Sequence, residues 1–174
     1  MQFVSLKKVL EYKNPSVIKR YRKEYKCSNE FANVMFENML KFFWLSALGN
    51  SLKKPYGHIF SKLTPLDDMW HTFILFTRDY TDFGNKYFGY YMHHKPTMDK
   101  ELKSRTKVQD LFFLCFGGAY DYLGEDTINS WYDLRPSRSK LVGAEIKQER
   151  FLKAFKSNFG YDAPKKYSFI VDQK

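Results

Sequence analysis

The chain has few cysteines, and those present form no recognisable motif. Among 174 residues only Cys27 and Cys115 occur, and neither belongs to a Cys-x-x-Cys pair. A disulfide framework and a zinc site built on paired cysteines are therefore excluded. Cys115 lies in an apolar run and is expected to be an inert core thiol, and Cys27 has no evident base beside it.

Long apolar segments are also missing. The longest apolar run covers residues 111–116, far short of the roughly 18 residues that span a bilayer. Lys7 and Lys8 interrupt the amino-terminal segment, so it lacks the apolar core of a signal peptide. From these absences and the low cysteine count we expect a soluble, cytoplasmic protein with no membrane partner.

The common catalytic motifs are absent as well. The sequence contains no Gly-x-Ser-x-Gly, His-Glu-x-x-His, P-loop or Gly-x-Gly-x-x-Gly, and its Phe-Gly-Gly-Ala-Tyr run (residues 116–120) lacks a strand-turn-helix context. There is no internal repeat, Gly/Ser linker or low-complexity tract. Residues 1–174 are therefore predicted to form one domain, with no reaction indicated by motif.

Aromatic and apolar residues are abundant, at 19% and 44% of the chain, which is ample material for a core. Apolar residues recur at helical spacing and strand alternation is nearly absent, so the fold class is predicted as all-α, an irregular bundle of about six to seven helices. We expect helices over residues 6–12, 15–26, 29–49, 64–83 or on to 88, 106–122, 128–132 and 144–157, with residues 167–171 extended.

Several residues predict where these helices begin and end. Asn14 with Pro15, and Ser28 or Asn29, are typical of helix starts, as are Thr64 and Pro65. Glycines are expected to end three helices, at Gly49, Gly89 and Gly124. The predicted central helix carries an apolar stripe of Phe31, Val34, Met35, Met39, Phe42, Phe43 and Leu45.

The net charge of +10 is concentrated at the two ends of the chain. Residues 1–26 and residues 135–174 each carry a net +6, and the centre carries −2. A basic helix with interleaved tyrosines suits an anionic partner, either nucleic acid or an acidic protein. The candidate surface comprises Lys19, Arg20, Tyr21, Arg22, Lys23, Tyr25 and Lys26.

A blander interpretation of this helix remains open. Lysine-rich helices commonly present a solvated face. The i, i+4 spacing of Tyr21 and Tyr25 equally suits two rings packed against a core.

Histidine and aspartate residues form a candidate site in the centre of the chain. Asp67 and His71 are four apart, so on a helix their side chains lie one turn above each other, and His93 and His94 follow in a later segment. Together these four can ligate Zn or another divalent metal such as Fe or Mn. The alternative is an ordinary ion pair on a polar helix face, followed by two histidines that fill a turn.

Residues 65–96 carry a resemblance to a known family. The pattern is an Asp, two variable residues, Trp-His, an apolar run, a Tyr, a Phe-Gly and a His-His-x-Pro. It is matched by Asp67, Trp70, His71, Ile74, Leu75, Tyr80, Phe88, Gly89, His93, His94 and Pro96. This segment resembles the glycine-rich domain-containing protein-like family, in the form of its small stand-alone bacterial members.

The resemblance implies a helical domain without a demonstrated activity. It extends loosely over residues 28–132, which leaves basic helical ends at 1–27 and 135–174. Many family members have Cys after an Asp-Phe pair, where this chain has Gly84. A site here therefore rests on the Asp and His residues, and the motif is either a polar, metal-binding site or a determinant of the fold.

Overall fold

The computed structural model describes residues 3–60, 63–94, 105–132, 152–153 and 156. Within these ranges the chain forms seven helices with described bounds and no strand, which confirms the all-α prediction. The helices are α1 (Leu6–Leu10), α2 (Pro15–Tyr25), α3 (Asn29–Leu52), α4 (Thr64–Ile74), α5 (Thr77–Phe88), α6 (Arg105–Leu123) and α7 (Glu125–Tyr132). None of these helices combines the length and the apolar character needed to cross a membrane.

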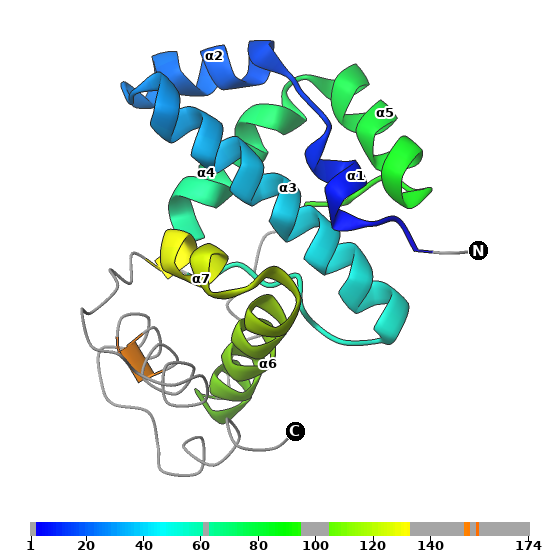
Figure 1. Cartoon of the computed structure of the whole chain (residues 1–174), viewed down its shortest axis with the longest axis vertical. Helices are drawn as coiled ribbons and strands as arrows, with labels where there is room; N and C mark the ends of the chain where they lie inside the picture. The colour runs from blue at the N-terminus through cyan, green and yellow to red at the C-terminus, as the bar shows by residue number, and fades with distance from the viewer. Residues whose placement is uncertain (1–2, 61–62, 95–104, 133–151, 154–155, 157–174) are drawn as a thin grey trace.

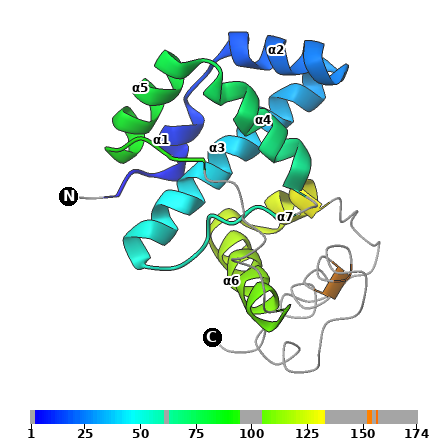
Figure 2. The ribbon, with the colours of Figure 1, turned by 180° about the vertical axis from the view of Figure 1, so that it is seen from behind.

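Helix α3 is the central element of the fold. It runs diagonally through the molecule and contacts α1, α2, α4, α6 and α7 (Figure 1). Helices α6 and α7 lie together at the opposite end of the molecule from α2, as the view from behind also shows (Figure 2). The core around α3 is rich in aromatic rings, and its fully buried large side chains include Tyr21, Phe42, Phe43, Phe73, Tyr80 and Phe83.

The predicted caps of α2 and α3 are confirmed. The Asn14 side-chain oxygen accepts a hydrogen bond from the Val17 N–H at 3.2 Å, and Pro15 occupies the first helical position. The Ser28 hydroxyl oxygen accepts from the Phe31 N–H at 3.0 Å. These side chains satisfy amide groups that have no partner within the helix, which fixes where each helix begins.

The predicted end of α3 at Gly49 is wrong. The helix continues to Leu52 and ends at Lys53, which adopts the left-handed conformation at φ 55°. Gly49 is needed for a close contact instead, because a Cβ there would lie 2.6 Å from the Lys54 carbonyl oxygen. Two members of the predicted apolar stripe, Phe31 and Val34, are each 42% exposed, so the buried stripe begins a turn later.

The single helix predicted from residue 64 to 83 or 88 is two helices. The break at Leu75–Phe76 lets Phe73 of α4 pack against Tyr80 and Phe83 of α5, with ring centroids 5.2 and 5.7 Å apart. In one straight helix, residues ten positions apart would be separated by about 15 Å. The gain in aromatic packing explains the break, and Gly89, at φ 81°, ends α5 as predicted.

The carboxyl-terminal predictions are tested only in part. Helix α6 matches the predicted 106–122. Helix α7 ends at Tyr132 as predicted but begins at Glu125 rather than at residue 128, and Gly124 separates the two helices at φ 81°. Of the helix predicted over 144–157, residues 152, 153 and 156 are described, and they are helical. The remainder of that helix and the extended segment predicted at 167–171 lie outside the described residues.

Replacing Gly49 tests the tight turn at the end of α3. Gly49→Ala should lower the free energy of unfolding by about 1–3 kcal/mol, because backbone must move to accommodate the methyl group. Gly117→Ala is the matched control, since its Cβ meets no described atom within 4 Å. It should raise stability by about 0.5–1 kcal/mol, the usual helical preference for alanine. Urea unfolding of both variants measures the difference, and a stabilised Gly49→Ala protein would contradict the packing argument.

Candidate metal centre

The first two candidate ligands lie on consecutive turns of α4. Asp67 occupies the first turn and His71 the last, and the Nδ1 atom of His71 lies 3.6 Å from Oδ2 of Asp67. The His71 side chain is 54% exposed and that of Asp67 28%. The helical spacing thus places one carboxylate and one accessible imidazole side by side, as predicted.

The third candidate ligand lies in a segment that is distant from α4 in the sequence. His94 follows α5, and its Nε2 atom lies 2.9 Å from Oδ1 of Asp67. Its ring centroid is 4.4 Å from that of His71, and its side chain is only 18% exposed. One ligand atom from each of the three residues lies within 4.8 Å of the other two. The structure therefore brings Asp67, His71 and His94 together.

A buried hydrogen-bonded relay holds the segment before His94 against α4 and α5. The indole Nε1–H of Trp70 donates to the Tyr80 hydroxyl oxygen at 2.8 Å, and the Tyr80 hydroxyl donates to the Met92 carbonyl oxygen. Trp70 also packs edge-on against the His94 ring, with centroids 4.3 Å apart. Trp70 therefore fixes His94 through direct ring contact and through the backbone two residues earlier.

Gly84 allows the segment that precedes His94 to pass close to α5. A Cβ at Gly84 would lie 2.7 Å from the Tyr90 carbonyl oxygen, so the segment runs directly against this face of α5. The resemblance described above implies Cys at this position in many family members. In the present backbone a side chain at residue 84 requires the segment to shift.

His93 is the sequence-predicted candidate that stays apart from the other three. It is exposed, and its ring packs against Tyr91 with centroids 4.9 Å apart. The adjacent histidines His93 and His94 thus differ in surroundings, and only His94 joins Asp67 and His71. Sequence alone could not separate them, because the segment has no regular structure that would set which ring turns inward.

A polar pair beside the cluster was not predicted from the sequence. The Tyr25 hydroxyl forms a hydrogen bond with the carboxylate of Asp68, the residue after Asp67. Burial raises the pKa of Asp68 above its usual value, and the bond from Tyr25 partly opposes this effect. The two residues are far apart in sequence, so no local pattern connects them.

Comparison with known proteins assigns the chain to a family. The model of the UCP032817-like family matches residues 6–121, which include α1 to α5 and most of α6. The chain belongs to the UCP032817-like family. This family is uncharacterised. No curated protein and no solved structure shows significant similarity to the chain.

The family match covers more of the amino-terminal region than the sequence resemblance did. It begins at residue 6, so α1 and α2 belong to the UCP032817-like region, whereas the resemblance described above began loosely at residue 28. The matched region contains Asp67, His71 and His94 together with the Trp70–Tyr80 relay. The resemblance to the glycine-rich domain-containing family stays a prediction.

The basic helix of this UCP032817-like chain is α2, and its residues lie in different surroundings. Tyr21 is 1% exposed and donates its hydroxyl to the Pro65 carbonyl oxygen at 3.1 Å, so its ring is a core element and offers no face to a partner. Tyr25 is 40% exposed and packs on Tyr21. The five basic candidates are exposed: Lys19, Arg20, Arg22, Lys23 and Lys26.

Cys115 has the character of a core thiol that the sequence predicts. It is buried in α6 and donates a hydrogen bond to the Pro55 carbonyl oxygen at 2.9 Å. Burial raises the pKa of the thiol to about 12, so it is protonated at neutral pH. A protonated, inaccessible thiol is a poor nucleophile.

Removing the Tyr80 hydroxyl tests the relay. Tyr80→Phe leaves the Trp70 Nε1–H and the Met92 carbonyl without a partner in a buried site, so it should cost about 2–4 kcal/mol of unfolding free energy. Tyr91→Phe is the control, since Tyr91 is 38% exposed and the substitution is chemically the same. Equal small losses in urea unfolding would show that the relay contributes little.

The relay also predicts a sensitivity to alkaline pH. Burial raises the pKa of Tyr80 from 10.0 to about 12, so the neutral phenol is favoured by the folded state. This stabilisation is complete below about pH 10 and is lost as the pH rises through about 12. Unfolding free energy should therefore fall less steeply above about pH 10 in Tyr80→Phe than in the wild type or in Tyr91→Phe. Parallel slopes in all three proteins would contradict the assignment.

Proposed function

We propose that Asp67, His71 and His94 form a binding site for one divalent transition metal, with zinc as the first choice. The observation that supports it is the convergence of a carboxylate and two imidazoles from two separate segments within 4.8 Å. Imidazole nitrogen and carboxylate oxygen are the ligands that Zn, Fe and Mn accept together.

The separations between the candidate ligand atoms suit a shared ion. Two ligands of a tetrahedral zinc, each about 2.0–2.1 Å from the metal, lie about 3.3 Å apart. The two nitrogen–oxygen distances, 2.9 Å from His94 to Asp67 Oδ1 and 3.6 Å from His71 to Asp67 Oδ2, fall on either side of that value. The two distances end on different oxygens of Asp67, and the three ligand atoms lie within 4.8 Å of one another, so side-chain rotations would be needed to bring them onto one ion.

Differences in exposure give the site a closed side and an open side. His94 is packed against Trp70, whereas His71 is more than half exposed. Three protein ligands leave at least one coordination position for water or a ligand from solution, the arrangement typical of metal sites that act as Lewis acids. A metal held by Asp67, His71 and His94 would supply Lewis-acid or hydrolytic chemistry.

The competing role for these residues is purely architectural. The Asp67 carboxylate accepts a hydrogen bond from His94, which by itself ties the 90–94 segment to α4. That role needs no contribution from His71, whose nitrogen is 3.6 Å from Asp67 and whose ring is exposed. His71 therefore separates the two functions, because it matters for a metal and little for the fold.

Metal analysis of the untagged protein tests the proposal. The purified chain, dialysed after exposure to zinc, should retain about one equivalent of metal. His71→Ala should lower zinc affinity by more than the 10–100-fold that loss of an outer-shell partner costs, with unfolding free energy changed by less than about 0.5 kcal/mol. Zinc should raise the melting temperature of the wild type and leave that of His71→Ala unchanged.

His93→Ala is the matched control for this experiment. It removes an imidazole from the same part of the chain, one residue from His94, without touching the cluster. It should bind zinc like the wild type. A wild-type content below about 0.1 metal per chain, or equal zinc affinity in His71→Ala and His93→Ala, would refute the metal site and leave the architectural role.

A further inference from the structure

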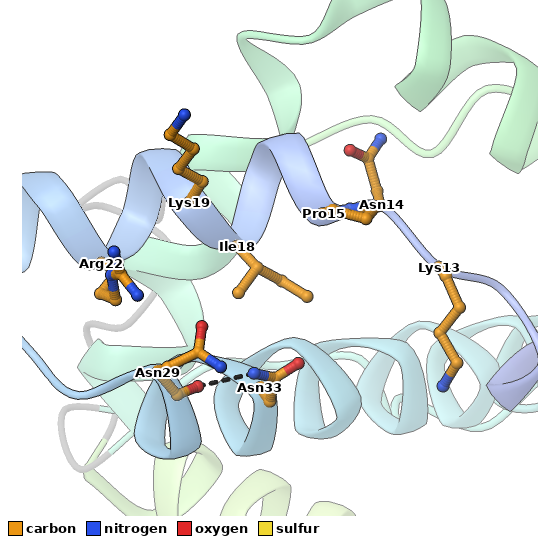
Figure 3. A pocket seen from close by; sticks show the side chains of 8 residues that line it. All are labelled: Lys13, Asn14, Pro15, Ile18, Lys19, Arg22, Asn29 and Asn33. Atoms are coloured by element: carbon orange, nitrogen blue, oxygen red, sulfur yellow. Dashed lines mark hydrogen bonds between the residues drawn. The ribbon is translucent and has the colours of Figure 1, made fainter.

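A groove between α2 and α3 is lined with basic and amide side chains and is separate from the candidate metal centre. Its volume is about 450 Å³, within the range of small-ligand sites. Eight residues line it, none of them acidic: Lys13, Asn14, Pro15, Ile18, Lys19, Arg22, Asn29 and Asn33 (Figure 3). Neither the cluster of Asp67, His71 and His94 nor its supporting relay contributes to this lining.

The Asp79 carboxylate accepts a hydrogen bond from the lining residue Asn14 at 2.7 Å, but in the described part of the chain it forms no ion pair with a basic residue of the lining. Lys19 and Arg22 form no ion pair within the described part of the chain, whereas Arg20 on the same helix is paired with Glu24 at 3.0 Å. The Lys13 ammonium donates to the Leu10 carbonyl oxygen at 3.3 Å, which leaves two of its three N–H groups. The lining therefore attracts an anion.

The remaining side chains divide the groove into charged ends and a less polar middle. Figure 3 shows Arg22 and Lys13 toward opposite ends, with Ile18 and the Asn33 amide between them. Asn33 donates to the Asn29 carbonyl oxygen at 2.6 Å, which holds its amide in place on α3. Such a groove accommodates an anionic group at one end and an uncharged organic body along its length.

The lining distinguishes a small anion from a nucleic-acid strand. Single strands are held by aromatic rings on which bases stack, and no aromatic residue lines the groove. Tyr21, the aromatic residue of α2 nearest the centre of the helix, is 1% exposed and bonded to Pro65. A guanidinium with an unoccupied fork is well matched to the oxygens of a phosphate group.

We propose that the α2–α3 groove is a binding site for a small organic phosphate, with Arg22 contacting the phosphate group and Lys19 adding positive charge on the same helix. The site is independent of the proposed metal centre. Its ligand is recognised by charge and by the two amides of α3 rather than by base stacking.

Two double variants of α2 with the same change in charge test this site. Lys19→Gln/Arg22→Gln alters the groove, and Arg20→Gln/Lys23→Gln removes one Lys and one Arg from the same helix outside it. The probes are AMP, inorganic pyrophosphate and a single-stranded oligonucleotide of about ten residues, titrated by calorimetry in low salt. Circular dichroism checks that each variant is folded.

The site predicts a specific pattern of results. The wild type and Arg20→Gln/Lys23→Gln should bind AMP with dissociation constants within about twofold of each other, and Lys19→Gln/Arg22→Gln at least about tenfold more weakly. In spectra of the wild type, AMP should shift the amide resonances of Ile18, Asn29 and Asn33 most. His71→Ala should retain AMP binding, which separates this site from the metal centre.

Three results would overturn the proposal. Equal weakening in both double variants would indicate attraction by overall charge. Binding of the oligonucleotide without AMP or pyrophosphate would indicate a nucleic-acid surface. Absence of resonance shifts in the wild type at millimolar AMP would exclude the groove, whether or not the variants fold.

Discussion

The hydrogen-bonded relay from Trp70 through Tyr80 to the Met92 carbonyl is the interaction on which the arrangement of the central part of the chain depends. It links α4, α5 and the segment after α5 through one buried phenol. An unpaired indole N–H or carbonyl in this position would be costly, so the three groups specify one another's positions. His94 reaches Asp67 because this relay fixes the backbone two residues before it.

The same constraint explains why α4 and α5 are separate helices. Tyr80 can bond to Trp70 only if the chain folds back after Ile74, and the fold-back also brings Phe83 against Phe73. Helix α3 supplies the surface on which this aromatic cluster packs, through Phe43. Packing of the core and positioning of the candidate ligands are therefore consequences of one arrangement, and a change in the relay affects both.

The candidate metal centre and the basic groove lie on different elements. The Asp67, His71 and His94 cluster belongs to α4 and the segment after α5, and the basic groove to α2 and α3. Tyr25 connects the two neighbourhoods, since it lies at the end of α2 and bonds to Asp68 beside the cluster. Its partner Tyr21 donates a hydrogen bond to the Pro65 carbonyl oxygen, which attaches α2 to the start of α4.

The sequence by itself determined the elements governed by local chemistry. The all-α class, the starts of α2 and α3 at Asn14 and Ser28, the end of α5 at Gly89 and the pairing of Asp67 with His71 all follow from contacts within a few residues. Tertiary structure alone decided the rest. Gly49 serves a close approach rather than a helix end, Tyr21 is buried, and His94 rather than His93 faces Asp67. Each depends on groups far away in the chain, whose contacts leave no periodic signal in the sequence.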